Sequence, residues 1–179
     1  MGHVGAPAPV LLILAAFSRH QESHAWARTK TESTWGPIAL ASEAFEFRET
    51  NYYDGSMGVG LRKQFFAYER LIDPERLVEF KLQTNDWEAE YAALAKHDEQ
   101  RPLNLDPGYI TLAKLVLAST KDHAHRIYLG HGIYAEITLK FRDGTWQASD
   151  WTYPDYRRAD FQEFFSQCRD FLKAASKIH

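Results

Sequence analysis

The stretch S-T-K-D-H-A-H-R-I-Y-L-G-H-G-I-Y-A-E, from Ser119 to Glu136, joins a run of small and charged side chains to an apolar, strand-like segment. Glu136 is the lone carboxylate in the apolar run 133–139. A strand that buries one face tolerates a charge there only when the charge is paired or useful. The stretch predicts a sheet with one polar focus; an outward-facing Glu136 on a half-exposed strand is the alternative.

On the C-terminal side, the pattern predicts antiparallel hairpins and a final helix. Strands are expected at 126–129, 133–141 and 145–149, and the turn Arg142-Asp143-Gly144 joins the last two. Asp160 and Glu163 have the spacing of a capping box for an amphipathic helix. The apolar face of this helix is expected to cover the sheet and comprises Phe161, Phe164, Phe165, Cys168, Phe171, Leu172 and Ala175.

On the N-terminal side, the first two thirds predict the order strand, helix, strand, strand, helix. The successive segments are 9–17, 19–35, 38–47, 61–71 and 73–96. This is the order of a ferredoxin-like, split β-α-β arrangement, which one further strand would complete. The fold class predicted is therefore α+β, in a single domain spanning residues 1–179.

Local signals place the ends of these elements. Ser18 and Gln21 form a possible capping box, Gly36-Pro37 predicts a helix stop, and Asp73-Pro74 predicts a helix start. Asn85 and Glu88 form a second possible capping box, which would break the second helix near Gln83.

The segments between these elements are less regular. Residues 51–60 contain three glycines and predict a loop. Residues 103–105 are a candidate fourth strand, followed by a turn at Asp106-Pro107-Gly108, and residues 112–118 fit a strand or a helix.

Composition limits the classes of partner. The chain has 179 residues, a net charge of −3 and a pI of about 6.2, which disfavours nonspecific nucleic-acid binding. Residues 43–106 contain 8 basic and 14 acidic side chains, whereas residues 119–158 contain 6 and 5. The C-terminal third is therefore the better place for an anionic ligand, with a solvated mixed surface as the alternative.

The single cysteine, Cys168, excludes an internal disulfide framework and favours a cytoplasmic location. Its place on an apolar helix face predicts a buried, inert thiol. The apolar run 8–17 is too short to span a bilayer, so no membrane association is expected.

His123 and His125 would share one face of a strand and could hold a metal with His131, Glu136 or Asp122 as a third ligand. This set is short, and the apolar helix faces already supply a core. We therefore predict no metal site and no cofactor.

Anion binding has a better set of groups. The chain has no P-loop and no dinucleotide fingerprint. Ser119, Thr120, Lys121 and Arg126 supply hydroxyls, an ammonium and a guanidinium within eight residues, which suits a phosphate or carboxylate. The alternative is a surface turn whose cations pair with Asp122 and Glu136.

Acid–base chemistry would need Glu136, Asp106 or His125 beside a substrate. Aromatic side chains gather in two expected loops, one with Tyr52 and Tyr53 and one in the run W-T-Y-P-D-Y at 151–156. These side chains could contact a ligand or a partner protein, or pack over the sheet edge.

Several longer motifs resemble an uncharacterised prokaryotic family, the domain of unknown function family 4416. They are N-Y-Y at 51–53, N-L-D-P-G-Y at 104–109, L-A-S-T-K-D at 117–122, H-R-I-Y-L-G at 125–130, G-I-Y-A-E at 132–136 and W-T-Y-P-D-Y at 151–156. The resemblance implies a single-domain cytoplasmic protein, and some members carry an automatic label of GTP-binding protein. The family position of His123 is commonly aromatic and that of His131 is variable. The motif residues carried over are Asp106, Lys121, Asp122, His125, Arg126, Tyr134, Glu136, Tyr153 and Asp155.

Two hypotheses follow for the function. The first is binding, with or without turnover, of a small anionic, phosphorylated or nucleotide-like ligand in a polar pocket. The second is a protein-interaction module without catalysis. If Lys121, Arg126, Glu136 and Asp106 converge on one cleft, the ligand hypothesis gains; if they scatter, the interaction module does.

Overall fold

The computed structural model describes residues 2–50 and 53–177. The strands are β1 (Leu11–Ser18), β2 (Ile38–Ala41), β3 (Phe45–Glu46), β4 (Arg62–Tyr68), β5 (Asn104–Ile110), β6 (Lys114–Ser119), β7 (Ile127–Gly130), β8 (Ile133–Arg142) and β9 (Thr145–Ala148). The helices are α1 (Gln21–Trp35), α2 (Asp54–Met57), α3 (Leu77–Ala93) and α4 (Ala159–Ala175), with 3₁₀ turns η1 (Pro74–Arg76) and η2 (Pro154–Arg157).

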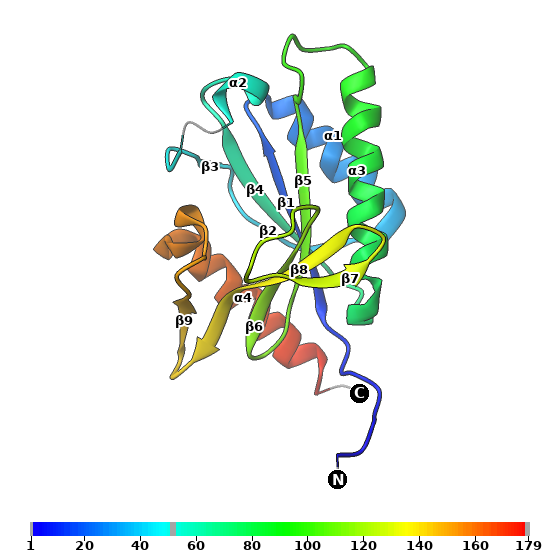
Figure 1. Cartoon of the computed structure of the whole chain (residues 1–179), viewed down its shortest axis with the longest axis vertical. Helices are drawn as coiled ribbons and strands as arrows, with labels where there is room; N and C mark the ends of the chain where they lie inside the picture. The colour runs from blue at the N-terminus through cyan, green and yellow to red at the C-terminus, as the bar shows by residue number, and fades with distance from the viewer. Residues whose placement is uncertain (1, 51–52, 178–179) are drawn as a thin grey trace.

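All the strands of the described chain join one antiparallel sheet. The order along it is β2-β4-β1-β5-β6-β8-β7, with β3 on β4 and β9 on β8. Figure 1 shows α1 and α3 along one side of this sheet and α4 on the other.

The first two thirds have the predicted ferredoxin-like arrangement. The elements β1, α1, β2, β4, α3 and β5 come in this order along the chain, with β3 and α2 inserted between β2 and β4, and the four strands lie in the order β2-β4-β1-β5. Antiparallel β4 lies between β1 and β2, which is the split β-α-β pattern. The α+β class, the antiparallel hairpins and the C-terminal helix are confirmed.

The period of two in β1 supplies apolar side chains to both layers. Leu12, Leu14 and Ala16 pack in the cluster that contains residues of α1 and α3. Leu11 and Ile13 pack in the cluster under α4. All five are almost fully buried, and burying a leucine or isoleucine side chain contributes about 1.5–3 kcal/mol. β1 is thus the central strand that its continuous apolar run predicts.

The expected capping box of the first helix is wrong. Ser18 is the last residue of β1, and its hydroxyl donates to the Pro102 carbonyl at 2.6 Å. The helix begins at Gln21 after His20, whose side chain makes no cap hydrogen bond. The predicted stop at Gly36 is confirmed, since its amide donates to the Glu32 carbonyl.

The predicted strand 38–47 is two strands, β2 and β3, both paired with β4. Ser42 interrupts them, because its side-chain oxygen accepts from the Phe65 amide at 2.9 Å while its own amide donates to the Phe65 carbonyl. The expected loop 51–60 contains the short helix α2, and Tyr52 lies outside the described residues.

The expected turn at Asp106-Pro107-Gly108 is also wrong, because β5 runs straight through it. Pro107 lies opposite Leu14 of β1, and β6 pairs with β5 only from Gly108 onward. A Cβ atom at Gly108 would lie 2.3 Å from the Val116 carbonyl oxygen, so glycine permits this close approach of the two strands. Residues 114–119 form the strand β6, which settles the open alternative at 112–118.

Two further helix signals act differently in the folded chain. The helix α3 is unbroken at Gln83, and Glu88 accepts from the Leu105 amide at 2.7 Å instead of capping a new helix. The helix α4 begins at Ala159 without a side-chain cap, because the Asp160 carboxylate binds Arg158. A tertiary partner thus engages Glu88, and a neighbouring arginine engages Asp160.

Candidate functional site

A cavity of about 710 Å³ lies on the side of the sheet that carries α4. Its lining comes from β4, β5, β6, β8, the segment after β3, the segment after β6 and the η2 turn. Among the described residues, α4 contributes no side chain to it. The cavity therefore lies over a part of the sheet that α4 does not cover.

Three charged side chains enter the cavity from strand positions whose neighbours are apolar. Lys63 of β4 pairs with Phe17, Asp106 of β5 pairs with Ala15, and Glu136 of β8 pairs with Leu117. Paired residues of an antiparallel sheet project to the same face. The polar floor of the cavity is thus built from core-facing positions of three strands.

Glu136 forms a buried ion pair with Arg126, and their side chains are 2% and 3% exposed. The Arg126 Nε donates to one Glu136 oxygen at 2.9 Å. Its Nη1 donates to the Ser119 hydroxyl and the Lys121 carbonyl, and its Nη2 donates to the Tyr153 hydroxyl at 2.6 Å. The alternative of an outward-facing Glu136 is therefore wrong. The guanidinium therefore links β6, β8 and the aromatic run 151–156 at the wall of the cavity.

His125 and Thr138 complete the contacts of Glu136. The His125 Nε2 lies 3.1 Å from the oxygen that Arg126 contacts, and the Thr138 hydroxyl donates to the other oxygen at 3.2 Å. His125 stacks on Trp151 with ring centroids 5.4 Å apart. His125 does not line the cavity, so it supports Glu136 from behind.

Asp106 is the cavity carboxylate with the most open side chain, which is 38% exposed. Lys81 of α3, from the opposite layer, donates to one of its oxygens at 3.0 Å, and Asn104 donates to the other at 2.7 Å. Burial raises the pKa of Asp106, but the charge and hydrogen bonds of Lys81 and Asn104 outweigh it and lower the pKa. Asp106 is consequently an ionised acceptor at neutral pH.

Lys63 and Asp155 form a second buried ion pair at the opposite wall. The Lys63 ammonium lies about 5 Å from the ring centroids of Phe17, Phe47 and Tyr156. Cation–π attraction adds to the ion pair in such a cage. Lys63 thus anchors the η2 turn to β4.

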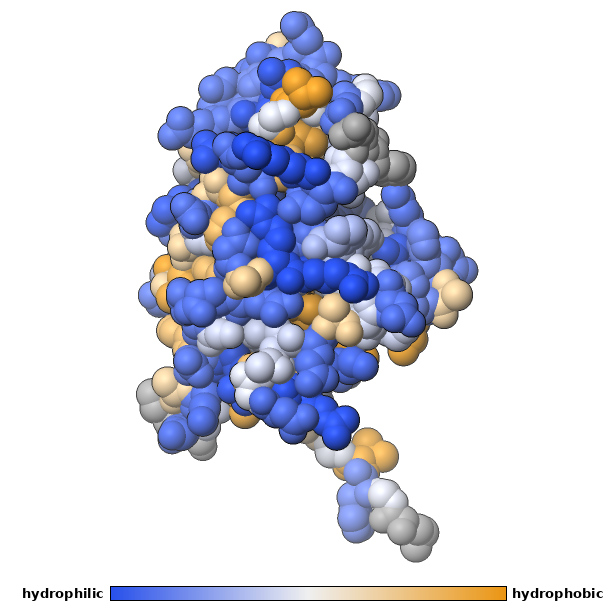
Figure 2. Space-filling model, turned by 90° about the vertical axis from the view of Figure 1, so that its left-hand side faces the viewer, coloured by the Kyte–Doolittle hydropathy of each residue, from blue (hydrophilic) through white to orange (hydrophobic). Residues whose placement is uncertain are grey.

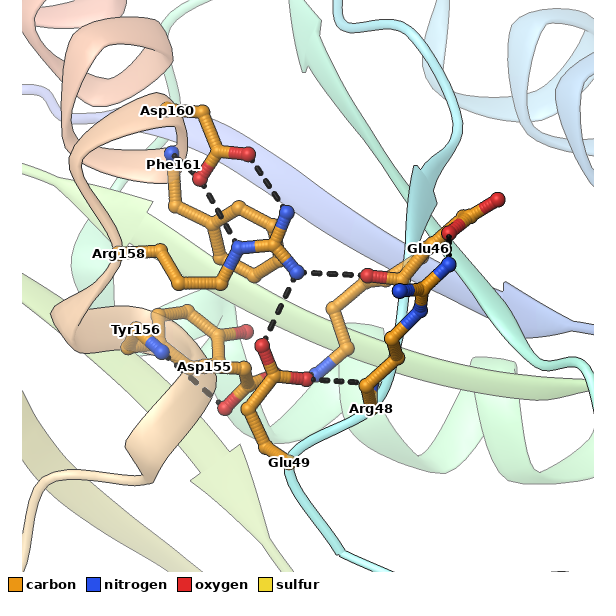
Figure 3. Close-up of polar contacts among 9 residues, drawn as sticks. Glu46, Arg48, Glu49, Asp155, Tyr156, Arg158, Asp160 and Phe161 are labelled. Carbon is orange, nitrogen blue, oxygen red and sulfur yellow. Dashed lines mark hydrogen bonds and ion pairs between the residues drawn. The ribbon is translucent and has the colours of Figure 1, made fainter.

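Arg158 fixes the rim beside this cage (Figure 3). Its guanidinium donates to both oxygens of Asp160, to the Glu46 carbonyl and to Glu49, which lines the cavity. The hydrogen bonds from Arg158 lower the pKa of Asp160. This fork connects the start of α4 to the segment after β3 and holds that wall in place.

The tyrosines of the cavity remain protonated. Burial raises the pKa of Tyr53, Tyr153 and Tyr156 above the usual tyrosine value. Nearby carboxylates raise the pKa of Tyr156 further, whereas Arg126 partly offsets the rise at Tyr153. Their hydroxyls are therefore donors rather than phenolates at neutral pH.

The structure brings most predicted site residues to this cavity, namely Ser119, Lys121, Arg126, Glu136, Asp106, Tyr53, Tyr153 and Asp155. Thr120, Tyr134 and His125 are not among its lining residues. Lining residues that the sequence reasoning missed include Phe47, Glu49 and Lys63, whereas His123 was considered only as a metal ligand and Tyr156 only as part of the aromatic run 151–156. Lys63 had a usable signal, because it precedes Phe65 and Ala67 on the same face of an apolar strand.

The other sequence expectations can be placed as well. His123 and His125 have ring centroids 5.7 Å apart, and in the described residues no third metal ligand joins them. Cys168 lies on the buried face of α4, and burial raises the pKa of its thiol, as an inert cysteine requires. None of the helices in the described ranges has the length and apolar character needed to cross a membrane.

Comparison with protein families supplies the remaining finding. The family model described as Domain of unknown function (DUF4416) matches residues 8–171 of the 179 residues. The chain belongs to this family. The DUF4416 match contains all nine strands of the described sheet and every lining residue of the cavity. Comparison with curated proteins and with solved structures gives no significant match.

Proposed function

We propose that this member of the DUF4416 family binds a small anionic ligand, of the phosphorylated or nucleotide-like class, in the cavity. One observation carries the proposal: Lys121 and Arg126 of the segment after β6, Glu136 of β8 and Asp106 of β5 converge on a single cavity of about 710 Å³. Cavities of 300–1,000 Å³ with apolar walls and a few fixed polar groups are the usual form of a small-molecule site. The expected cytoplasmic location and single-domain organisation remain part of this proposal.

Each wall offers a different contact to such a ligand. Lys121, His123 and Ser119 line the same cavity, and an ammonium, an imidazole and a hydroxyl suit the anionic group. Ionised Asp106 accepts from a ligand hydroxyl or amine. The rings of Phe47, Tyr53 and Tyr153 present flat surfaces for a planar base.

The same contacts assign different roles to the candidate catalytic groups. Glu136 is occupied by Arg126, His125 and Thr138, so we assign it to holding the wall. Asp106 has an open side chain and a lowered pKa, so it suits the role of a charged hydrogen-bond acceptor for the ligand better than that of a general base.

The test is a thermal-shift screen of nucleotides, nucleosides, sugar phosphates and inorganic phosphate, followed by calorimetric titration of each hit. Lys121→Gln should weaken binding by about tenfold through loss of one charge-assisted contact of roughly 1.5 kcal/mol. The control Lys140→Gln, an exposed β8 lysine outside the cavity, should bind like wild type. The proposal fails if no compound in the screen binds, or if both variants behave alike.

A protein-interaction module is the second candidate, and exposed apolar side chains favour it. Ile127, Tyr128 and Leu129 are 70%, 59% and 43% exposed on β7, which ends the sheet order. Asp155 and Tyr156 of the run W-T-Y-P-D-Y are buried, which removes part of the surface first expected for it. Figure 2 shows another face on which hydrophilic side chains predominate and apolar ones form small separate patches. Nucleic acid stays disfavoured by the acidic pI.

Tyr153→Ala and Tyr128→Ala form a matched pair for separating the two candidates. Both tyrosines are exposed by more than a third, but only Tyr153 lines the cavity. Small-molecule binding should fall in Tyr153→Ala and persist in Tyr128→Ala. Loss of partner capture only in Tyr128→Ala, with no small-molecule binding in wild type, would favour the interaction module.

A further inference from the structure

A second cluster of polar side chains lies where α1 begins and the chain leaves α3. His20 directly precedes α1, and His97 and Glu99 belong to the segment between α3 and β5. One possible ligand atom from each of these three residues lies within 4.8 Å of the other two. These residues are far apart in the sequence, so the fold alone creates the cluster.

The carboxylate of Glu99 is already oriented by two partners. Its Oε2 lies 3.0 Å from the His20 Nε2, and its Oε1 accepts from the Arg19 guanidinium at 3.1 Å. A further carboxylate is near, since a Glu22 oxygen lies 3.7 Å from the His97 Nε2. Metal-ligating carboxylates commonly have such an outer hydrogen bond, which here would come from Arg19.

The His97 ring is held beside the cluster by hydroxyl groups of α1 and α3. The Tyr91 hydroxyl accepts from the Ser23 hydroxyl at 3.0 Å and lies 3.0 Å from the His97 Nε2. The Tyr91 oxygen can also accept from the His97 Nε2–H, which leaves the electron pair of the neutral ring on Nδ1. A neutral imidazole nitrogen of this kind is the form that binds a metal.

The two imidazoles stack with centroids 3.7 Å apart and an interplanar angle of 12°. Each nitrogen electron pair lies in its ring plane, so shared coordination requires the rings to tilt out of the stack. Ligand atoms around a tetrahedral ion lie roughly 3.4 Å apart when metal–ligand bonds are about 2.1 Å. The ligand atoms, which lie within 4.8 Å of one another, must therefore approach by up to about 1.4 Å, and the partly exposed His20 ring is the one that can move.

We propose that His20, His97 and Glu99 form a binding site for a divalent transition metal, with Glu22 as the fourth ligand. Two imidazoles and carboxylate oxygen suit zinc and its neighbours better than magnesium or calcium. This site is separate from the His123–His125 pair on which the expectation of no metal was based. A bound ion would connect the start of α1 to the segment before β5. That segment is also connected to α2, because the Arg101 amide donates to the Ser56 carbonyl.

The probes are Zn²⁺ and Co²⁺ added to full-length protein that has first been treated with a chelator. We expect one ion per chain and, at free Zn²⁺ about a hundredfold above Kd, a rise in Tm of about 5–10 °C. Bound Co²⁺ should show visible absorption bands, and acidification should release it as the imidazoles become protonated.

His20→Ala and Glu99→Gln should each weaken Zn²⁺ binding by at least about tenfold. The control His131→Ala, which changes an exposed histidine in the β7–β8 turn, should bind Zn²⁺ like wild type. Both cluster variants change partly exposed side chains, so their folding can be confirmed by circular dichroism before titration. Absence of saturable binding in wild type, or equal affinity in His20→Ala and wild type, would overturn the proposal.

Discussion

The two faces of the sheet differ in what covers them. On one face α1 and α3 cover β1, and Leu12, Leu14 and Ala16 lie in a continuous apolar cluster. On the other face the apolar cluster under α4 gives way to the cavity, where Lys63 and Asp106 take core-facing positions. The difference shows that, among the described residues, charged side chains occupy core-facing strand positions only where no helix covers the strand. Each of these charges has a specific protein partner.

The largest expected effect comes from breaking the buried ion pair. Arg126→Ala should destabilise the protein by about 3–5 kcal/mol, because it strands the Glu136 carboxylate in a site that is 2% exposed. Urea unfolding followed by circular dichroism measures this loss. Arg28→Ala is the control, since the Arg28–Glu32 pair on α1 is exposed and should contribute less than about 0.5 kcal/mol. Similar losses in the two variants would contradict the buried pairing.

The close approach of β5 and β6 gives the next largest effect. Gly108→Ala should cost about 1–3 kcal/mol, because its Cβ would lie 2.3 Å from the Val116 carbonyl and force the strands apart. Gly55→Ala in α2 is the matched control, since a Cβ there has nothing within 4 Å. Chemical denaturation compares the two variants; an unchanged midpoint for Gly108→Ala would show that the strands can separate freely.

A smaller effect is expected from the aromatic wall. Tyr153→Phe keeps the ring but removes the hydroxyl that accepts from Arg126 at 2.6 Å. The expected loss is about 0.5–1.5 kcal/mol, as for one hydrogen bond. Stability of Arg126→Ala and of the double variant should be measured alongside. If the stability loss of the double variant equals the sum of the two single losses, the Tyr153 hydroxyl has no energetic coupling to Arg126, which would contradict the predicted hydrogen bond.

The smallest effect concerns the pH dependence of two carboxylates. Burial raises the pKa of Glu88 in the folded protein. Its ionisation therefore lowers the stability of the fold as the pH rises from the unfolded-state pKa of about 4.3 through the folded-state pKa. The lowered pKa of Asp106 has the opposite sign, and its contribution is lost as the pH falls from about 3.9 through its folded pKa. Glu88→Gln should therefore reduce the decline above pH 4, and Asp106→Asn should reduce the loss in acid. Unfolding free energies measured from about pH 2 to pH 8 test both signs.

Much of the fold could be predicted from local patterns. The continuous apolar run gave β1, the order of elements gave the split β-α-β arrangement, and Arg142-Asp143-Gly144 gave the β8–β9 turn. The Asp106-Pro107-Gly108 segment failed because a local turn signal cannot reveal that Val116 approaches Gly108 from another strand. Tertiary contacts overrode local chemistry there.

The candidate site divides in the same way. Its chemistry was visible in Ser119, Lys121, Arg126 and Glu136, because these lie within one stretch of sequence. The residues that hold the site in place were not visible in the sequence. Lys81 contacts Asp106 from the layer opposite α4, and Lys63 pairs with Asp155, which is 92 residues away in the chain. Contacts of that kind depend on which strands are neighbours, which no short motif records.

The most direct test of the cavity as a ligand site is a ¹H–¹⁵N NMR titration of the full-length protein with each compound that stabilises it in the thermal-shift screen. The account predicts saturable shifts for amides of the lining segments at residues 117–126 and 153–156, together with residues around Lys63 and Asp106. Amides of β2 and the C-terminal half of α4 should remain unchanged. Shifts confined to β7, or scattered shifts that do not saturate, would contradict the assignment of the cavity as the binding site.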